Sequence, residues 1–398
     1  MSKNIIFCAD GTWNGPGESD SDDKTAPDTN VFKLFLSLDG KDDAGTTKLE
    51  KEQERTLKAA DGTVQQVAKY LHGVGDSQTF LVRILGGTLG AGLITRIVRG
   101  YTFISRNYQP GDKIFLVGFS RGAYTARALA GLISAKGLLD PNKIDLADKT
   151  AAYRLGVAVW FAERKAALHG DQGLLSNLFN AVLDFPIFLA HPPSDDQLVA
   201  APIEAVAVWD TVGSLGIPVY NARLVRLDVF GFANKKLSAN IRNGRHAVAI
   251  DEQRGDFSPT LWEDRDGVVQ VLFPGAHSDV GGGYPLAGGE SGLSDGALKW
   301  MMSELGALGV RFSADPAVVP HPDAAGCAHQ PWAHLPFSKL LHEPRPFPKG
   351  LRLSQSVLDR IGGAAVVADP GLQAAAYIPG NLRDYVAGKV AAAGIEIA

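Results

Sequence analysis

Residues 118–122 read GFSRG and match the G-x-S-x-G nucleophile-elbow pattern. This pattern needs a strand before it and a helix after it, because the sharp turn between them lifts the serine above the sheet. Residues 113–117 are a short apolar run typical of a buried parallel strand, and residues 121–136 have a helical pattern. The sequence therefore predicts Ser120 as a nucleophile; a serine that caps a helix is the alternative.

A second G-x-S-x-G match lies over residues 292–296, in a different local context. It follows a glycine-rich loop and precedes a helical pattern over residues 295–305. Ser294 is therefore interpreted as a helix N-cap whose hydroxyl accepts a backbone N–H.

A serine hydroxyl is a weak nucleophile and needs a base, which an acid in turn must orient. In chains that carry the elbow, the acid and then the histidine follow the serine. Asp210 ends the apolar run 203–209, so we expect it at the carboxyl end of a strand, where open α/β sheets bind ligands. A turn-forming aspartate is the alternative. His277 follows the run 268–273 in a glycine-dense loop, and it is the predicted base.

The remaining histidines and a nearby acid receive structural interpretations. His246 precedes an apolar run and is interpreted as a packed histidine. Asp279 is expected to brace the loop of His277, and direct pairing with His277 is its alternative. Four later histidines lie in Pro-rich sequence and are expected to face solvent: His321, His329, His334 and His342.

Ester hydrolysis also needs two backbone N–H groups that hold the oxyanion of the transition state. The N–H of Arg121, the residue after the nucleophile, is the first expected donor. The second is expected from Gly11, in a DGT turn that follows a strand-like run and that Asp10 can brace. The glycine turn over residues 73–75 is the rival, and a purely structural turn is the alternative for both.

Composition describes an ordinary globular chain and disfavours several classes of function. The 398 residues include 39 Lys+Arg and 43 Asp+Glu, a formal net charge of −4, which disfavours nucleic-acid binding through a broad basic surface. Two cysteines disfavour a disulfide framework or a Cys-based metal site. The glycine-rich segment 86–92 lacks the Gly-Lys-Ser/Thr of a P-loop. No metal and no cofactor are therefore expected.

Strand-like runs alternate with helical patterns, which predicts a mostly parallel α/β sheet flanked by helices. Residues 39–66 are charged and interrupted by glycine, so an exposed hairpin or excursion is expected there. The expected strands are 4–9, 67–71, 113–117, 203–209 and 268–273. The expected helices are 31–38, 93–108, 121–136, 153–169, 174–189 and 295–305.

The chain is interpreted as a single domain over residues 1–398 with two additions. Residues 140–200 interrupt the strand–helix rhythm and are expected to form an inserted helical cap, with extra crossover helices as the alternative. Residues 306–398 are expected to be a C-terminal extension packed on the core. The chain enters a strand too early for a signal peptide, and residues 81–98 are too interrupted by arginine for a membrane helix. A cytoplasmic location in the producing cell is expected.

Several motifs together resemble one known family. The most specific are GFSRGAYTAR over residues 118–127 and HSDVGGGY over residues 277–284. WDTVG over residues 209–213 and DGTWN over residues 10–14 accompany them. The resemblance runs from about residue 4 to residue 305. It is to the α/β-hydrolase family that includes the type VI secretion phospholipase effectors.

This resemblance implies an α/β-hydrolase fold and places the family's triad on Ser120, Asp210 and His277. It implies a serine ester hydrolase, a phospholipase or lipase that cleaves acyl esters through an acyl-enzyme. A soluble small-ester carboxylesterase and a catalytically idle binding module are the alternatives. The implied partners are a phospholipid substrate, transient contact with a membrane surface and, for an effector, an immunity or secretion partner met by a type VI export route.

Overall fold

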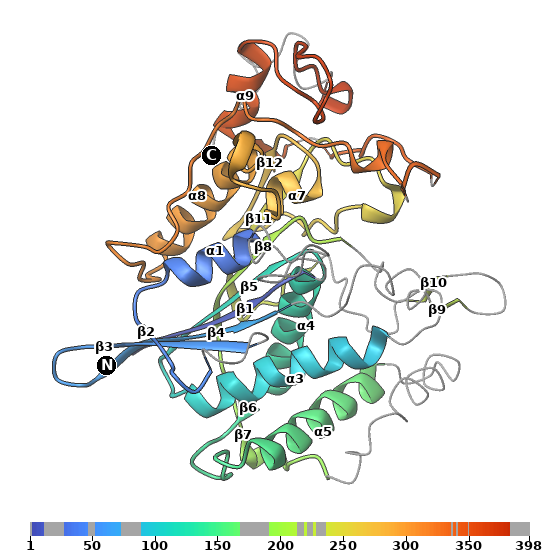
Figure 1. Ribbon diagram of the computed structural model, residues 1–398. Coiled ribbons are helices and arrows are strands. Elements are labelled where there is room, and N and C mark those ends of the chain that lie inside the picture. The colour runs from blue at the N-terminus through green and yellow to red at the C-terminus, as the bar shows by residue number, and fades with distance from the viewer. Residues whose placement is uncertain are drawn as a thin grey trace.

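A long central sheet organises the chain (Figure 1). The computed structural model describes residues 2–11, 28–46, 52–72, 89–167, 191–212, 219–220, 226–227, 236–335, 337–339, 341–348 and 350–382. The sheet strands within these ranges are β1 (Asn4–Ala9), β2 (Lys41–Asp42), β3 (Glu52–Lys58), β4 (Val64–Leu71), β5 (Lys113–Phe119), β8 (Ile203–Trp209), β11 (Ile241–Ala249), β12 (Val268–Phe273) and β13 (Arg352–Leu353). Their spatial order is β13-β12-β11-β8-β5-β1-β4-β3-β2.

Every neighbouring pair from β13 to β4 is parallel, and only the β4-β3-β2 edge is antiparallel. The predicted α/β class with a mostly parallel sheet is therefore confirmed. The expected excursion over residues 39–66 contains β2 and β3, which extend this edge of the sheet. β4 begins at Val64, earlier than expected, because its first residues pair with the end of β3 at Lys58. Two short strand pairs lie outside the sheet: β6 (Leu138–Leu139) with β7 (Leu198–Val199), and β9 (Val219–Tyr220) with β10 (Arg226–Leu227).

Helices cover both faces of the sheet (Figure 1). The α-helices are α1 (Asn30–Ser37), α3 (Leu89–Asn107), α4 (Arg121–Lys136), α5 (Lys149–Ala167), α7 (His277–Gly281), α8 (Gly292–Ala307) and α9 (Gln355–Gly362). The 3₁₀ turns are Asp195–Gln197, Gly255–Phe257, Ala287–Gly289, Pro331–Ala333, Phe337–Lys339 and Gly380–Leu382. α3, α4 and α5 lie on one face, and α1 and α8 lie on the other. The second helix expected in the insertion, over residues 174–189, lies outside the described residues.

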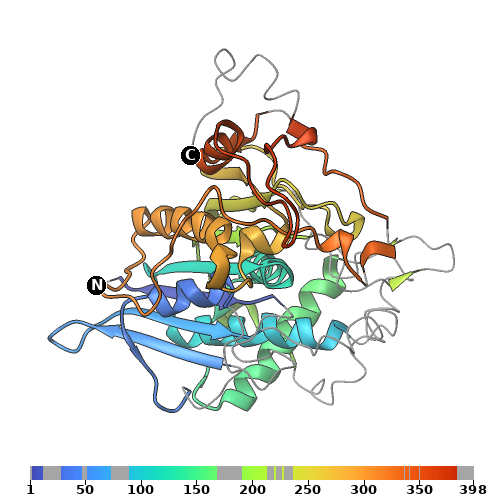
Figure 2. The same cartoon turned by 45° about the horizontal axis from the view of Figure 1, so that its top comes forward.

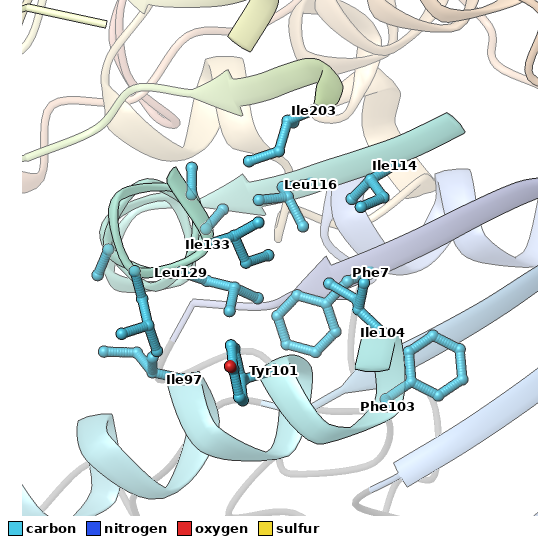
Figure 3. Packing of buried hydrophobic residues seen from close by; sticks show 14 of the residues in the cluster. Phe7, Ile97, Tyr101, Phe103, Ile104, Ile114, Leu116, Leu129, Ile133 and Ile203 are labelled. Atoms are coloured by element: carbon cyan, nitrogen blue, oxygen red, sulfur yellow. The ribbon is translucent and has the colours of Figure 1, made fainter. Parts of the chain in front are cut away.

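The strand that leads to Gly11 is buried on both faces. Along β1, Ile5 and Phe7 point into the core under α3 and α4, while Ile6 and Cys8 point into the core under α1 and α8. Figure 3 shows Phe7 packed between α3 and α4. This burial on both faces explains why the strand is a continuous apolar run.

The chain after α8 returns along the sheet and packs on it. Leu353 of β13 and Val357 of α9 join Leu272 of β12 and Val248 of β11 in a separate apolar cluster. Figures 1 and 2 both show this C-terminal segment, in orange to red, on the side of the molecule that carries α7 and β12. The segment therefore lies beside the strand ends that carry Asp210 and His277.

Within the described residues, no helix has the length and apolar character needed to cross a bilayer.

Candidate active site

Ser120 occupies the sharp turn between β5 and α4. Its backbone has φ 56° and ψ −122°, a strained conformation for a residue with a Cβ atom. The Ser120 N–H donates to the carbonyl oxygen of Trp209 at 3.2 Å, which ties the turn to the end of β8. The residue is partly exposed, and although it precedes α4 its side chain makes no capping hydrogen bond. The helix-cap alternative therefore does not describe this serine.

Two glycines let this turn close. A Cβ atom on Gly118 would lie 2.4 Å from the carbonyl oxygen of Gly122, and a Cβ atom on Gly122 would lie 2.0 Å from the carbonyl oxygen of Ala9. Both obstacles are backbone atoms, which cannot move aside as a side chain can. The motif glycines therefore bring α4 against the ends of β1 and β5.

Replacing Gly122 by alanine is expected to lower the free energy of unfolding by about 3 kcal/mol, because the new methyl group meets the backbone of a buried strand. Gly296 is the matched control: it holds the same place in the second G-x-S-x-G match, and a Cβ atom there would meet nothing within 4 Å. Gly296→Ala should leave stability unchanged or slightly higher. Urea unfolding of both variants measures the difference, and equal effects would contradict the proposed packing constraint.

Asp210 and His277 are in direct contact. Asp210 follows β8 with φ 37°, is fully buried, and places Oδ2 at 2.5 Å from Nδ1 of His277. The imidazole lies between two aromatic rings, with centroid distances of 4.6 Å to Phe119 and 5.0 Å to Phe257. Its Nε2 atom is buried and has no hydrogen-bond partner within the described part of the chain. The structure thus leaves Nε2 available as a proton acceptor.

The segment that carries His277 is a short helix, α7, where the sequence suggested a glycine-dense loop. The helix forms because the Asp279 side chain accepts the Ala276 N–H at 2.8 Å and so holds its first turn. His277 is consequently fixed at the helix start, directly after β12.

The electrostatics keep Asp210 charged and His277 neutral. Burial alone would raise the pKa of Asp210, but the Arg345 guanidinium and His277 hold that pKa well below its usual range. Burial lowers the pKa of His277, and the bond to Asp210 only partly opposes this. A neutral ring that donates from Nδ1 presents Nε2 as an acceptor, which is the form a general base needs.

Arg345 is the residue at this site that the sequence patterns did not reveal. Its Nη1 lies 2.7 Å from Asp210 Oδ1 and its Nη2 lies 2.9 Å from Oδ2. It stands in Pro-rich sequence without periodicity, so no local signal connects it to the aspartate.

Gly11 and Arg121, the expected oxyanion donors, flank the serine from two elements. Arg121 begins α4 directly after Ser120, and a Cβ atom on Gly11 would lie 3.4 Å from the Cβ of Ser120. The Gly11 N–H donates to Oδ1 of Asp10 at 2.6 Å, so Asp10 braces this turn. The rival glycine turn over residues 73–75 lies outside the described residues.

The carboxylate of Asp10 is buried and accepts hydrogen bonds from several groups around it. Its Oδ2 accepts hydrogen bonds from Thr29 and Tyr70, each at 2.7 Å. Burial raises the pKa of Asp10 to about 6, although these donors, the Gly11 N–H and Arg96 all oppose the rise.

His246 is a packed histidine, as the sequence predicted. It is fully buried, its Nε2 accepts the Thr211 N–H at 3.1 Å, and its ring meets Trp262 edge-on at 5.5 Å. Burial, with a contribution from Arg127, lowers the pKa of His246 to about 3. The folded protein therefore keeps this ring neutral.

Exchanging His246 for glutamine is expected to weaken the acid sensitivity of folding. The unfolded chain binds a proton at this histidine near pH 6.5, whereas the folded chain does so only near pH 3. Between these values the group lowers the unfolding free energy by about 1.4 kcal/mol for each unit of falling pH. Urea unfolding of both proteins from pH 7 to pH 4 should give converging curves, whereas parallel curves would contradict this role.

The expectation that the late histidines face solvent was wrong for His329. This side chain is buried, with Nδ1 at 2.7 Å from Asp279 Oδ1, and it stacks on Tyr284 at a centroid distance of 3.4 Å. Burial lowers its pKa, but Asp279 and Glu290 overcome this and raise it. Asp279 thus braces α7 by pairing with His329, and its alternative pairing with His277 is not seen.

The N-cap interpretation of Ser294 was also wrong. α8 begins one turn earlier with Ser291 as its N-cap, and the buried Ser294 hydroxyl donates to the Ser291 carbonyl at 2.9 Å. The glycines before Ser294 predicted a loop, so the sequence did not indicate that the helix begins at Gly292.

No group of three or more His, Cys, Asp or Glu side chains in the described ranges is arranged to hold a metal ion.

Fold and site together define an α/β protein with a serine elbow after β5 and an Asp–His pair that joins the ends of β8 and β12, the two strands on either side of β11. Residues 3–304 match the family model for the type VI secretion system (T6SS) phospholipase effector Tle1-like catalytic domain, and the chain belongs to this family. A Saccharomyces cerevisiae relative, the uncharacterized protein YEL023C, is 26% identical over 268 residues, which cover 64% of this chain and 32% of that protein. The chain therefore spans about a third of that relative's length.

Two solved structures are similar at lower identity. One is an uncharacterized protein from Pseudomonas aeruginosa, at 16% identity and a TM-score of 0.41, with 79% of this chain and 47% of that chain covered. The other is the Tle1 effector bound to the VgrG spike of the Type 6 secretion system, at 18% identity and a TM-score of 0.37, with 72% and 52% covered.

Proposed function

We propose that this chain is a serine ester hydrolase of the α/β-hydrolase fold that cleaves the acyl esters of phospholipids. The observation that carries the proposal is the buried contact of 2.5 Å between Asp210 and His277, in a protein whose serine sits at a strand–helix elbow. The chain order of serine, aspartate and histidine is the one expected for this fold. Membership of the phospholipase effector family supports phospholipid as the substrate class.

In the proposed reaction, His277 Nε2 takes the proton of Ser120 Oγ while Oγ attacks the ester carbonyl carbon. The Asp210 carboxylate stabilises the imidazolium that forms. This imidazolium then gives its proton to the leaving alcohol oxygen as the C–O bond breaks. A water molecule, deprotonated by His277, then attacks the acyl-enzyme carbonyl carbon. The bond to Ser120 Oγ breaks, the imidazolium returns its proton to Oγ, and the fatty acid leaves.

The oxyanion is proposed to accept the N–H groups of Arg121 and Gly11. In the structure the Gly11 N–H donates a hydrogen bond to the Asp10 carboxylate at Oδ1. When the oxyanion forms, the N–H is proposed to leave this carboxylate and donate to the oxyanion instead. Asp10 has two further donors, the hydroxyls of Thr29 and Tyr70, which bond to its other oxygen, Oδ2, and do not depend on the Gly11 N–H. We therefore expect the turn to keep its shape when the Gly11 N–H changes its acceptor from Asp10 to the substrate oxyanion.

The family's effector character supports a second element of the proposal, export by a type VI route with a secretion partner and contact with a target membrane surface. A cap over residues 140–200 stays a proposal, because residues 168–190 lie outside the described part of the chain. Within this range α5 packs against α3, where Gly156 lies beside Val98, on one face of the sheet.

Lipid vesicles and soluble esters together test the substrate class. Phospholipid vesicles are incubated with the protein, and released fatty acid and lysophospholipid are measured by mass spectrometry beside a nitrophenyl ester series of increasing acyl length. We expect vesicle hydrolysis and a preference for long acyl chains. Turnover of short soluble esters alone would replace the proposal with a small-ester carboxylesterase, and no turnover of any ester would indicate an idle binding module.

A further inference from the structure

The catalytic aspartate of the proposed triad is held by a cation from the C-terminal extension. Arg345 lies beyond the end of the family match at residue 304, yet it is buried against Asp210. Its two terminal nitrogens reach the two carboxylate oxygens at 2.7 and 2.9 Å. Nη1 also donates to the carbonyl oxygen of Ala249 at 2.8 Å, and Nη2 donates to that of Phe257. The guanidinium is therefore fixed by its surroundings.

We propose that Arg345 is a positioning residue, through which the C-terminal extension keeps Asp210 ionised and aimed at His277. This inference rests on the proposed hydrolase function. Each oxygen of Asp210 has two donors: Oδ1 takes Arg345 and the Ala249 N–H, while Oδ2 takes Arg345 and His277. Four donors in fixed directions leave the carboxylate one orientation.

The charge of Arg345 is as important as its geometry. A buried carboxylate without a partner takes up a proton instead of staying charged, and a protonated Asp210 could not stabilise the imidazolium. With Arg345 present, the buried group of guanidinium, carboxylate and neutral imidazole has no net charge. Without Arg345, the Asp–His pair carries one negative charge and therefore binds a proton at a higher pH than in the wild-type protein. A protonated pair has no free Nε2 lone pair to act as the general base.

Other charges near the pair do not replace Arg345. Glu252 accepts the backbone N–H of His277 at 3.3 Å, but its charge is matched by the Arg254 guanidinium at 2.8 Å. His246, which also faces Asp210, stays neutral.

The extension is anchored where Arg345 enters the site. Asn381 donates to the Arg345 carbonyl oxygen at 3.1 Å and to that of Ile250 at 3.0 Å, joining the extension to the end of β11. Phe337 of the same extension packs on Phe257, whose ring meets His277. The extension thus contacts Asp210 directly, through Arg345, and reaches His277 indirectly, through the ring of Phe257.

Two substitutions in the full chain separate charge from geometry. For Arg345→Gln we expect kcat on a nitrophenyl ester to fall by roughly 100-fold, because the carboxylate loses its fixed direction. The acidic limb of the kcat/KM profile, and the titration of His277 followed by ¹⁵N NMR, should move up by about one pH unit or more. Arg345→Lys should leave the acidic limb of the profile in place and lower kcat less than Arg345→Gln does. Lysine supplies the positive charge but not the paired Nη1 and Nη2 contacts with both carboxylate oxygens.

Arg360→Gln is the matched control. Arg360 is a buried arginine of the same extension that donates to the carbonyl oxygens of Ala324 and Gly326 at 2.8 and 2.7 Å. Its loss should lower thermal stability without moving the titration of His277. An equal shift in both variants would show general loosening of the extension and would overturn the positioning role.

The outcomes separate this inference from the function on which it rests. Arg345→Gln with wild-type kcat and an unmoved His277 titration overturns the inference. If Arg345→Gln does not fold, Arg345→Lys is measured in its place. Wild-type kcat in Arg345→Lys would show that the two-nitrogen contact of the guanidinium does not position Asp210, which also overturns the inference. A wild-type protein without ester turnover overturns the proposed function instead, and the NMR titration then still measures how Arg345 acts on the Asp–His pair.

Discussion

Alanine in place of Ser120 is expected to reduce ester hydrolysis by roughly 10⁴-fold or more while the fold is retained. The serine hydroxyl is the atom that attacks the carbonyl, so no other described group at the turn can take its place. Ser120 is partly exposed and its side chain makes no capping hydrogen bond to α4, so removal of the hydroxyl should shift the melting temperature only slightly. Steady-state kinetics and thermal unfolding of the purified variant measure both effects.

Ser294→Ala is the matched control for this substitution. Ser294 is the serine of the second G-x-S-x-G match, but it is buried in α8 and bonded to Ser291. Its alanine variant should lose about 1 kcal/mol of stability and keep its activity. Retained turnover in the Ser120 variant, or lost turnover in the Ser294 variant at intact stability, would contradict the assignment of the nucleophile.

Asparagine at position 210 is expected to lower kcat by roughly 10⁴-fold. A neutral amide cannot stabilise the His277 imidazolium, and it can hold the ring in the wrong tautomer. The same substitution leaves Arg345 as a buried cation without its anion, so stability should fall by about 3 kcal/mol. Kinetics and urea unfolding on the same preparation separate the two losses.

A buried acid elsewhere in the chain distinguishes the loss of catalysis from the loss of stability. Asp295 is buried in α8, pairs with Lys33 at 2.8 Å and is hydrogen-bonded to neither member of the Asp–His pair. Asp295→Asn should lose stability comparably and keep kcat. If the Asp210 variant kept more than about a tenth of wild-type kcat, the triad role of Asp210 would not stand.

Three strands at the site could be predicted because each is buried along most of its length. A parallel strand covered by helices on both faces is a plain apolar run, as in β1, β5 and β8. The turn after β5 could be predicted because its glycines and serine are local to one another. Chain order then placed Asp210 and His277 after two later strands, β8 and β12, whose ends the structure brings into contact across β11.

The missed residues depend on contacts between distant parts of the chain. Arg345 meets Asp210 and His329 meets Asp279 only because the extension folds back along β12 and α7. Both residues stand in Pro-rich sequence, where no periodicity marks a buried face. Their burial is decided by the path of the extension in space, which local spacing does not encode.

Covalent labelling with a fluorophosphonate probe, followed by peptide mass spectrometry, tests most directly whether Ser120 is an activated nucleophile. The probe forms a stable bond with a serine only where a base and oxyanion donors activate it. We expect one adduct per chain on the peptide that contains Ser120, absent from Ser120→Ala and strongly slowed in Asp210→Asn. An unmodified Ser120 in folded wild-type protein, or an adduct on another serine, would contradict the proposed triad.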